Sequence, residues 1–259
     1  MKLKIDFHTH SHKSFDSVMS YKEIIESAKK RGLDGVCICD HACTDISESL
    51  KNDNDDFIII PAMEITTGKN HIIGMFLENE PMLELNQKLA APLEQIVEET
   101  HKKGGICILA HPFERMKEGK ETMLRRADKV IKLVDGIETY NSRAPYKYSA
   151  ANKLALTKAN ELNIICRTAG SDGHLPCEIG SAYCIVDTPS RSLEDIKNAV
   201  LAGKTEIVGK HCKRIYITKS ELIKASKFKY PLSRKLKLYL SYPIRALADL
   251  FDVICGRKL

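Results

Sequence analysis

The chain of 259 residues has no tryptophan, and only 6% of its residues are aromatic. It also lacks any uncharged apolar run of eighteen residues. Because a membrane-spanning helix needs about 20 predominantly apolar residues, the sequence predicts no such helix. The first residues, MKLKIDFHTH, have too short an apolar stretch and too early a charge for a secretory signal peptide. We therefore expect a cytoplasmic protein.

The nine cysteines include no CxxC pair and are too sparse for a disulfide scaffold. Several of them stand in short β-like runs, such as Cys37 and Cys39, so we expect reduced thiols in the core. The content of 43% apolar and 29% charged residues is enough to bury one sizeable core. These proportions exclude a disordered chain and a disulfide-stapled miniprotein.

Charge is distributed unevenly along the chain. The net charge is +6, but residues 210–259 alone carry +10, and residues 1–209 carry −4. We therefore predict one domain over residues 1–209 and a basic extension over residues 210–259. Leu and Tyr recur among Lys and Arg in the extension, which favours helices. Packing on the domain or on a second subunit is the preferred role for them, with peripheral contact with an anionic membrane or with nucleic acid as alternatives.

Up to residue 209, short β-like runs alternate with helical runs. Ser20 and Glu23 form a capping-box pattern, and Gly32, Gly104 and Gly203 stand where helices should end. The predicted strands are Leu3–Phe7, Gly35–Cys39, Phe57–Pro61, His71–Phe76, Ile106–Ala110, Gly136–Tyr140, Ile164–Ala169 and Ser181–Val186. The predicted helices are Tyr21–Arg31, Leu93–Lys103, Thr122–Leu133, Lys147–Leu162 and Leu193–Ala202.

Strands that alternate with helices favour a parallel sheet, either closed as a barrel or open and doubly wound. The position of the chemically active residues decides between the two. They fall at or just past the carboxyl ends of different predicted strands, and they are His8, His41, Glu64, His111, Glu138 and Asp172. A barrel gathers such residues at one face, whereas an open sheet concentrates them near one switch point. We therefore predict an α/β fold with a distorted barrel.

The first strand ends in Asp6, His8 and His10, whose side chains alternate and so point to the same face. Two imidazoles with a nearby carboxylate suit zinc, manganese or iron, and Asp6 is placed to orient a ligand histidine. Similar residues recur near later strands, in Asp40-His41, Glu64, His71, His111-Pro112 and Ser171-Asp172-Gly173-His174. Burial of so many histidines and carboxylates is costly unless bound metal ions compensate for it.

The ordered series DFHTHS, CDH, the glutamate of PAMEI, AHP and GSDGH resembles the polymerase and histidinol phosphatase (PHP) family of metal-dependent phosphoesterases. The resemblance covers about residues 3–209. It implies a distorted seven-stranded (β/α) TIM-like barrel with three divalent metal ions at its carboxyl-terminal face. The sequence departs from some members at Asp16, which stands where they have a histidine.

The resemblance implies one ligand set for each of the three ions. His8, His10, Glu64 and Asp172 would hold the first, and Glu64 would bridge to a second completed by His71 and His111. Asp16, His41 and His174 would hold the third. The ions would be zinc, manganese or iron, and a metal-bridged hydroxide would attack the phosphorus without a covalent enzyme intermediate. Asp172, His174 and Arg143 are the expected catalytic residues.

Residues outside the ligand motifs are candidates for substrate binding. Arg143 and Arg115 lie in loops on the expected active face, where a guanidinium can hold a phosphate in bidentate fashion. Asn141 and Lys69 are weaker candidates. Glu138 is either a partner of a metal ligand or a buried structural acid. The remaining histidines, His12, His101 and His211, are expected at the surface.

The preferred function is hydrolysis of a phosphate monoester of a small metabolite or nucleotide. A nuclease acting on DNA or RNA ends is the alternative that the basic extension supports. A third hypothesis is a non-catalytic module of a larger assembly. The complete set of nine ligands argues against it. Hydrolysis of C–N bonds, as in amidohydrolases, usually calls for a different ligand order.

Overall fold

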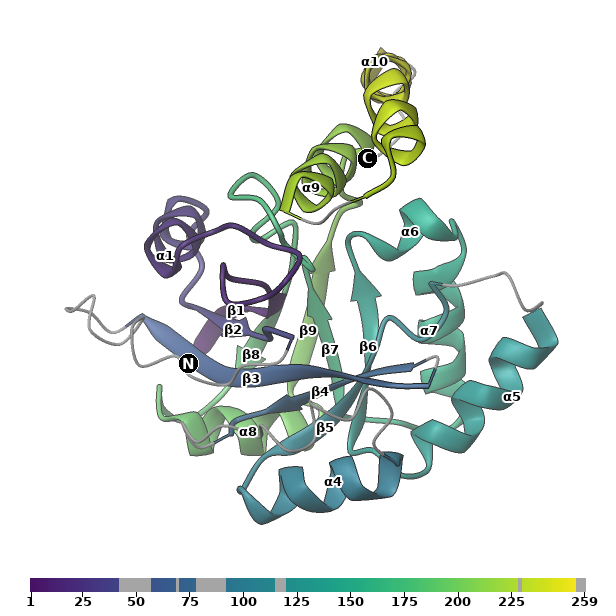
Figure 1. Cartoon of the computed structure of the whole chain (residues 1–259). Helices are drawn as coiled ribbons and strands as arrows, with labels where there is room; N and C mark the ends of the chain where they lie inside the picture. Colours follow the sequence, from purple (N-terminus) through teal and green to yellow (C-terminus); the bar gives the residue numbers. More distant parts are fainter. Residues whose placement is uncertain (42–56, 69, 78–91, 115–119, 228–229, 255–259) are drawn as a thin grey trace.

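A computed structural model describes residues 1–41, 57–68, 70–77, 92–114, 120–227 and 230–254 (Figure 1). The described strands form one sheet in the order β7-β6-β5-β4-β3-β2-β1-β8-β9. Their bounds are β1 (Lys2–Thr9), β2 (Gly35–Ile38), β3 (Ile58–Thr67), β4 (Asn70–Met75), β5 (Ile106–Ala110), β6 (Gly136–Asn141), β7 (Arg167–Gly170), β8 (Ala182–Asp187) and β9 (Thr205–Gly209).

The sheet is strongly curved and nearly closes into a barrel. The segment after β7 returns to β1, where the Asp172 amide donates to the His8 carbonyl at 2.8 Å and the His10 amide donates to the Gly173 carbonyl at 3.0 Å. Gly170 permits this approach, because a Cβ added to it would lie 2.2 Å from the Cβ of His8. The distorted barrel predicted from the sequence is therefore confirmed.

Two of the described strands, β4 and β8, run opposite to the others. β4 is antiparallel to both β3 and β5, and β8 is antiparallel to both β1 and β9. The remaining described strands share one direction, so their carboxyl ends lie at the same end of the barrel. The expectation of a parallel sheet thus fails for β4 and β8, and the nine described strands exceed the seven that the resemblance implied.

Helices cover the outside of the sheet, as in Figure 1, where α4 lies against β4 and β5. The capping box of Ser20 and Glu23 is present at the start of the first helix. Gly32, Gly104 and Gly203 have φ angles of 69°, 71° and 70°, and each follows a helix. The helices of the barrel are α1 (Tyr21–Lys30), α4 (Leu93–Lys102), α5 (Lys120–Ile131), α6 (Ala144–Lys147), α7 (Ala151–Glu161) and α8 (Leu193–Leu201).

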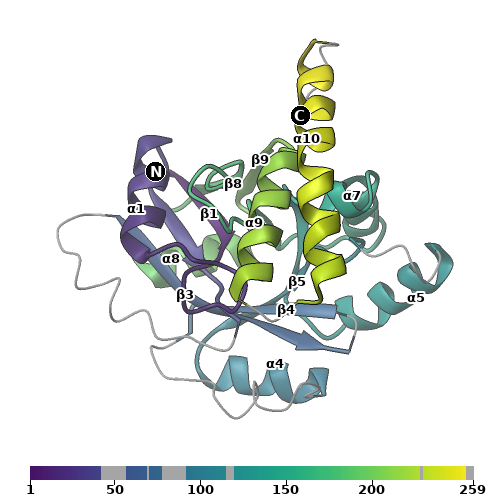
Figure 2. The same ribbon diagram turned by 45° about the horizontal axis from the view of Figure 1, so that its top comes forward.

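The carboxyl-terminal extension is helical, as predicted. It forms α9 (Arg214–Lys227) and α10 (Leu232–Ile254), which lie side by side (Figures 1 and 2). The extension is joined to the barrel by backbone hydrogen bonds, in which the Lys210 amide donates to Ser181 at 2.9 Å and the Cys212 amide donates to Ser142 at 2.8 Å. No helix in the described part of the chain combines the length and apolar character needed to cross a bilayer.

Candidate metal centre

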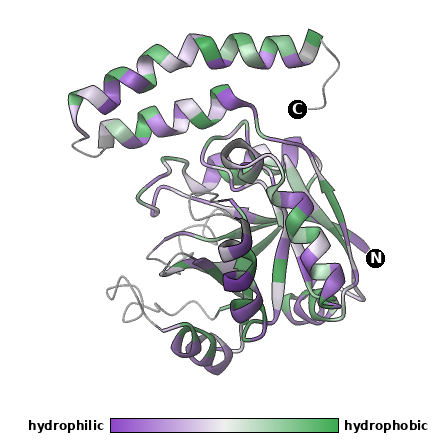
Figure 3. Ribbon diagram, turned by 90° about the vertical axis from the view of Figure 1, so that its right-hand side faces the viewer, coloured by the Kyte–Doolittle hydropathy of each residue, from purple (hydrophilic) through white to green (hydrophobic). Residues whose placement is uncertain are grey.

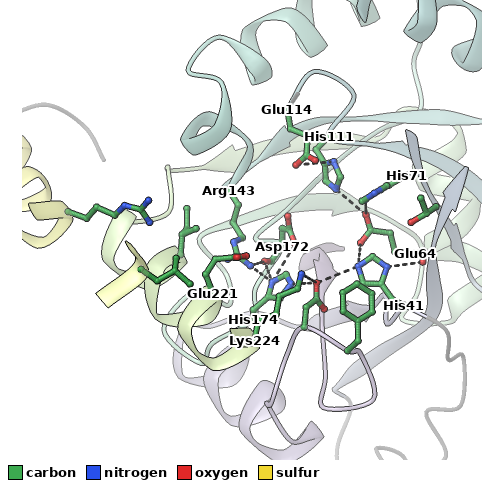
Figure 4. Close-up of a pocket in the computed structure, with 16 residues that line it drawn as sticks. His41, Glu64, His71, His111, Glu114, Arg143, Asp172, His174, Glu221 and Lys224 are labelled. Carbon is green, nitrogen blue, oxygen red and sulfur yellow. Dashed lines mark hydrogen bonds and ion pairs between the residues drawn. The ribbon is translucent and has the colours of Figure 1, made fainter. Parts of the chain in front are cut away.

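All nine predicted ligands lie at one end of the barrel (Figure 4 labels six of them). They come from elements far apart in the sequence: β1 and the turn after it, the segments that follow β2, β5 and β7, the interior of β3 and the start of β4. Their side chains are buried or nearly so. The set is His8, His10, Asp16, His41, Glu64, His71, His111, Asp172 and His174.

Glu64 lies at the centre of the cluster. Its Oε1 is 2.7 Å from His71 Nδ1 and 3.0 Å from His111 Nε2. Its Oε2 is 3.4 Å from His8 Nε2 and 3.3 Å from His10 Nε2. The two oxygens of one buried carboxylate therefore face two different groups of imidazoles.

Asp172 completes the group around His8 and His10. Its Oδ1 lies 3.8 Å from His8 Nε2 and 3.4 Å from His10 Nε2, and the two imidazole Nε2 atoms are 3.2 Å apart. Both imidazoles and the carboxylate thus point their donor atoms at one small volume. Bonds of about 2.0–2.2 Å from one ion would place ligand atoms at about this spacing.

Asp16 lies beside two further imidazoles of the cluster, those of His174 and His41. Its Oδ2 is 3.1 Å from His174 Nε2 and 3.6 Å from His41 Nε2. His41 Nε2 is also 3.4 Å from Glu64 Oε2, so His41 stands between this group and the central carboxylate. Asp16 Oδ2 thus faces the imidazoles of His41 and His174.

His71 reaches the cluster because β4 runs in the reverse direction. It is the second residue of β4 and therefore lies at the amino-terminal end of that strand. In a parallel strand this position would lie at the far end of the barrel. The reversal places it beside Ala110, one residue before His111.

Two of the nine residues have unusual backbone conformations. His111 has a φ angle of 25° and Asp172 one of 53°, values that side chains with a Cβ rarely adopt. Both follow directly or closely on strand ends. Strained backbone of this kind is concentrated at functional sites, where the surrounding structure holds it in place.

Residues behind the ligands hold them in position. Glu138 Oε1 lies 3.0 Å from His8 Nδ1, and its Oε2 accepts from the His111 amide at 2.8 Å and from Asn141 Nδ2 at 3.1 Å. Asp6, expected to orient an imidazole, instead accepts from the backbone amides of Ser171 and Gly180, at 2.9 and 2.8 Å. Asp6 thus fixes the loop after β7, while Glu138 contacts the His8 ring.

The electrostatics of the cluster follow from burial and from the close packing of opposite charges. Burial opposes the charged form of His8, but Glu138, Asp172 and Glu64 outweigh it and raise the pKa of this imidazole well above its usual value. Burial also disfavours an ionised Glu64, yet the imidazoles around it hold the pKa of this carboxyl well below its ordinary value. Glu64 therefore stays ionised, as cation binding requires.

A cavity of about 510 Å³ opens onto the cluster. Arg143, predicted to bind substrate, lines this cavity and is buried. Its Nη1 contacts His174 Nδ1, its Nη2 donates to Ser220 Oγ at 2.5 Å, and its Nε lies 3.6 Å from Glu178 Oε1.

Asn141 does not line the cavity. Its side-chain Nδ2 donates to carboxylate oxygens of Glu138 and Asp172. Its side-chain Oδ1 accepts from the backbone amides of Arg143 and Ala144.

The sequence reasoning missed the part of the cavity wall that the extension supplies. Figure 4 shows Glu221 and Lys224 of α9 facing the cluster, and α10 contributes Leu238 and Arg245. Lys224 Nζ lies 3.7 Å from Asp16 Oδ2. These residues belong to no recognised motif, so only the basic character of the extension as a whole could have drawn attention to them.

The other predicted residues lie outside the site or outside the described residues. Arg115 and Lys69 fall outside the residues that the structure describes. His12, His101 and His211 are exposed, as expected, and His101 Nε2 lies 2.8 Å from Asp135 Oδ2.

Comparisons with known proteins agree with this architecture. A family model described as PHP-associated matches residues 149–205. An uncharacterized protein of Methanocaldococcus jannaschii, MJ1587, is 29% identical over 169 residues, which cover 60% of this chain and 91% of that protein. Two solved structures are also similar in fold.

One is a two-domain protein of Bacteroides vulgatus containing a predicted PHP-like metal-dependent phosphoesterase. It matches with a TM-score of 0.61 and 19% identity over 81% of this chain, which spans 65% of that structure. The other is the lesion-specific endonuclease PfuEndoQ of Pyrococcus furiosus, with a TM-score of 0.58 and 18% identity over 92% of this chain and 66% of that one. The chain has a PHP-like fold and a PHP-associated segment, which confirms the resemblance carried by its motifs.

Proposed function

We propose that the chain is a metal-dependent phosphoesterase that hydrolyses a phosphate monoester of a small molecule or nucleotide. The observation that carries this proposal is the division of Glu64 between two groups of imidazoles, with Oε1 near His71 and His111 and Oε2 near His8 and His10. A carboxylate in this position can bridge two cations. The fold that the chain shares with PHP-like phosphoesterases supports the same assignment.

The residues present fit divalent ions. Buried imidazole and carboxylate donors at separations of about 3–4 Å suit zinc, manganese or iron. In our proposal three such ions are held. His8, His10, Glu64 and Asp172 hold the first, Glu64 with His71 and His111 holds the second, and Asp16 with His41 and His174 holds the third.

Bound ions of this kind lower the pKa of a coordinated water toward neutrality and offset negative charge that develops on phosphoryl oxygens. The protein residues have other roles. Arg143 is fixed by Glu178 and Ser220, so its guanidinium presents a preorganised positive charge beside His174 and Asp172. Preorganised charge stabilises a transition state without the cost of reorientation.

Lys224 adds a second cation to the same side of the cavity. Its Nζ lies 3.7 Å from Asp16 Oδ2 and 4.8 Å from the centre of the Phe15 ring. We assign it to binding the substrate phosphate. Asn141 has the role of orienting Asp172, because its amide hydrogen bonds go to protein groups.

The dimensions of the cavity favour a small substrate. A volume of about 510 Å³ falls within the range of about 300–1,000 Å³ typical of small-molecule sites. Helices α9 and α10 supply part of its wall. Because the extension is basic, the end of a nucleic acid is the second candidate substrate. One protein of similar fold is a lesion-specific endonuclease.

The test compares Glu64→Gln with an exposed control, Glu98→Gln on α4, in purified full-length protein. Glutamine keeps the size of Glu64 but removes the charge that would balance two cations. We expect Glu64→Gln to lose bound metal, measured by mass spectrometry of the metal content, and to lose nearly all hydrolysis of an aryl phosphate monoester. The control should match the wild type in both.

A Glu64→Gln variant with wild-type metal content and rate would contradict the bridging assignment. Substrate class is tested separately with an aryl monoester, an aryl diester and a single-stranded DNA with a labelled end. Metal-dependent turnover of the monoester alone supports the proposal. Turnover confined to the DNA end would replace it with the nuclease assignment.

A further inference from the structure

Helix α10 has two faces of opposite character. The inner face is fastened to α9 by polar contacts: Arg214 Nη1 lies 3.2 Å from Asp249 Oδ1 and 2.5 Å from Asp252 Oδ2, and Arg245 Nη1 donates to Thr218 Oγ1 at 2.7 Å. These contacts fix which side of α10 turns away from the barrel. Figure 3 shows α10 on the outer side of α9.

The outer face carries a stripe of large apolar side chains, each between 54% and 80% exposed. At about 100° per residue the stripe occupies about 140° of the helix circumference and runs for about 33 Å. No charged residue falls within that arc. We call this set of apolar side chains the α10 stripe. Its members are Leu232, Leu236, Tyr239, Leu240, Ile244, Leu247, Leu250, Phe251 and Ile254.

The size of the stripe is unusual for a surface in contact with water. Its side chains expose on the order of 1,000 Å² of largely apolar surface, whereas the largest apolar patch of a typical monomer is about 300–600 Å². Patches beyond this size mark a surface that binds a partner. The chemistry of the partner follows from the charges beside the stripe.

The charges that flank the stripe are positive. Lys237 is exposed and Lys235 is partly exposed, one on each side of its amino-terminal half. The two acidic residues of α10, Asp249 and Asp252, are buried against Arg214 on the opposite face. An apolar stripe with a basic border is the arrangement of helices that lie in the plane of a membrane surface.

We propose that the α10 stripe docks on the surface of a lipid bilayer that contains anionic lipids. The helix would lie parallel to the bilayer, with its apolar face about 5–10 Å deep among headgroups and acyl chains. The flanking Lys235 and Lys237 side chains would contact lipid phosphates. This docking is independent of the proposed phosphoesterase activity.

Charge complementarity favours lipid over a second copy of the chain. In a parallel pairing of two α10 helices, the basic borders would face one another. In an antiparallel pairing, Lys235 and Lys237 would meet the other end of the helix, where both carboxylates are engaged by Arg214. An anionic bilayer offers negative charge along the whole stripe.

Docking would also place the cavity close to the bilayer. The inner side of α10 supplies Leu238 and Arg245 to the cavity wall, and a helix is about 10–12 Å across. The cavity therefore lies about one helix diameter from the proposed membrane surface. A phosphorylated molecule held at that surface would be near the cluster of histidines and carboxylates.

The experiment measures co-sedimentation of the full-length protein with vesicles of phosphatidylcholine, alone or with phosphatidylglycerol. We expect binding to the mixed vesicles that weakens as salt is raised, and at least tenfold weaker binding to neutral vesicles. The double substitution Leu240→Glu with Ile244→Glu should reduce binding to mixed vesicles at least tenfold. Its matched control, Leu156→Glu with Ile165→Glu, changes exposed apolar residues outside α10 and should bind like the wild type.

A second pair of variants separates the basic border from the stripe. Lys235→Gln with Lys237→Gln should weaken binding to mixed vesicles, whereas Lys132→Gln with Lys153→Gln, also at exposed positions, should not. Unchanged melting curves would show that all four variants fold. Sedimentation equilibrium without lipid reports the oligomeric state.

Three outcomes would overturn the proposal. The first is a wild-type protein that binds neither type of vesicle. The second is a stable dimer that fails to bind vesicles and that Leu240→Glu with Ile244→Glu converts to a monomer, which would assign the stripe to a second copy. The third is vesicle binding that these two substitutions leave unchanged.

Discussion

Substitution of Glu138 by glutamine should weaken metal binding about 10–100-fold while leaving the barrel folded. Glu138 touches no predicted metal position, but it is buried at 2% exposure and accepts from three groups around the centre. If His8 binds an ion through Nε2, its Nδ1 carries the proton and donates to Glu138 Oε1, at 3.0 Å. Partners of this kind set the tautomer of a ligand imidazole.

Glutamine removes one of the two acceptors in either orientation. If its amide nitrogen replaces Oε2, it faces two donors, the His111 amide and Asn141 Nδ2, and a buried unpaired donor costs about 1–3 kcal/mol. If the nitrogen replaces Oε1, His8 must move its proton to Nε2, the atom that faces Glu64 and Asp172. A protonated Nε2 cannot bind an ion.

The expected 10–100-fold loss corresponds to about 1.4–2.7 kcal/mol of binding free energy. Titration calorimetry with zinc or manganese measures it directly, with the exposed Glu98→Gln as the matched control and a melting curve to confirm folding. Metal affinity within twofold of the wild type would refute the reasoning, because it would mean that Glu138 does not orient a ligand.

Two further predictions concern packing and substrate binding. In Gly170→Ala the new Cβ would lie 2.2 Å from His8 Cβ, so β7 must move away from β1. We expect destabilisation of about 1–3 kcal/mol, seen as a fall in Tm of about 2–12 °C. A Tm equal to that of the wild type would show that the strands separate without cost. Lys224→Gln should raise KM for a phosphate monoester severalfold while metal content stays unchanged. An unaltered KM would remove Lys224 from the substrate site.

Much of the barrel could be predicted from the sequence because its signals are local. The cap at Ser20, the turns at Gly32, Gly104 and Gly203, and the apolar runs of the strands each depend on a few adjacent residues. Strand direction is different, since an apolar run reads the same in a parallel and an antiparallel strand. The reversal of β4 and β8 therefore could not be predicted from apolar runs. The one hint in the sequence was that His71 stands at the start of its predicted strand, while other candidate ligands stand at strand ends.

Seven of the nine candidate ligands could be found because they stand in an ordered series of motifs, which lacks Asp16 and His71. The structure brings all nine to one end of the barrel. Their supports were harder to assign. Asp6 was expected to orient an imidazole but binds backbone amides, while Glu138 holds the His8 ring. Which of two buried acids faces a ring depends on tertiary geometry. The cavity wall from α9 and α10 is likewise tertiary, because no local pattern links the extension to the barrel.

The most direct test of the central claim is a crystal structure of the metal-loaded protein, with anomalous scattering measured at the absorption edge of the bound metal. The account predicts three anomalous peaks. They should lie about 2.0–2.3 Å from donor atoms of the His8, His10, Glu64 and Asp172 set, the Glu64, His71 and His111 set, and the Asp16, His41 and His174 set. An empty cluster, or peaks that leave Glu64 without contact to any ion, would contradict it.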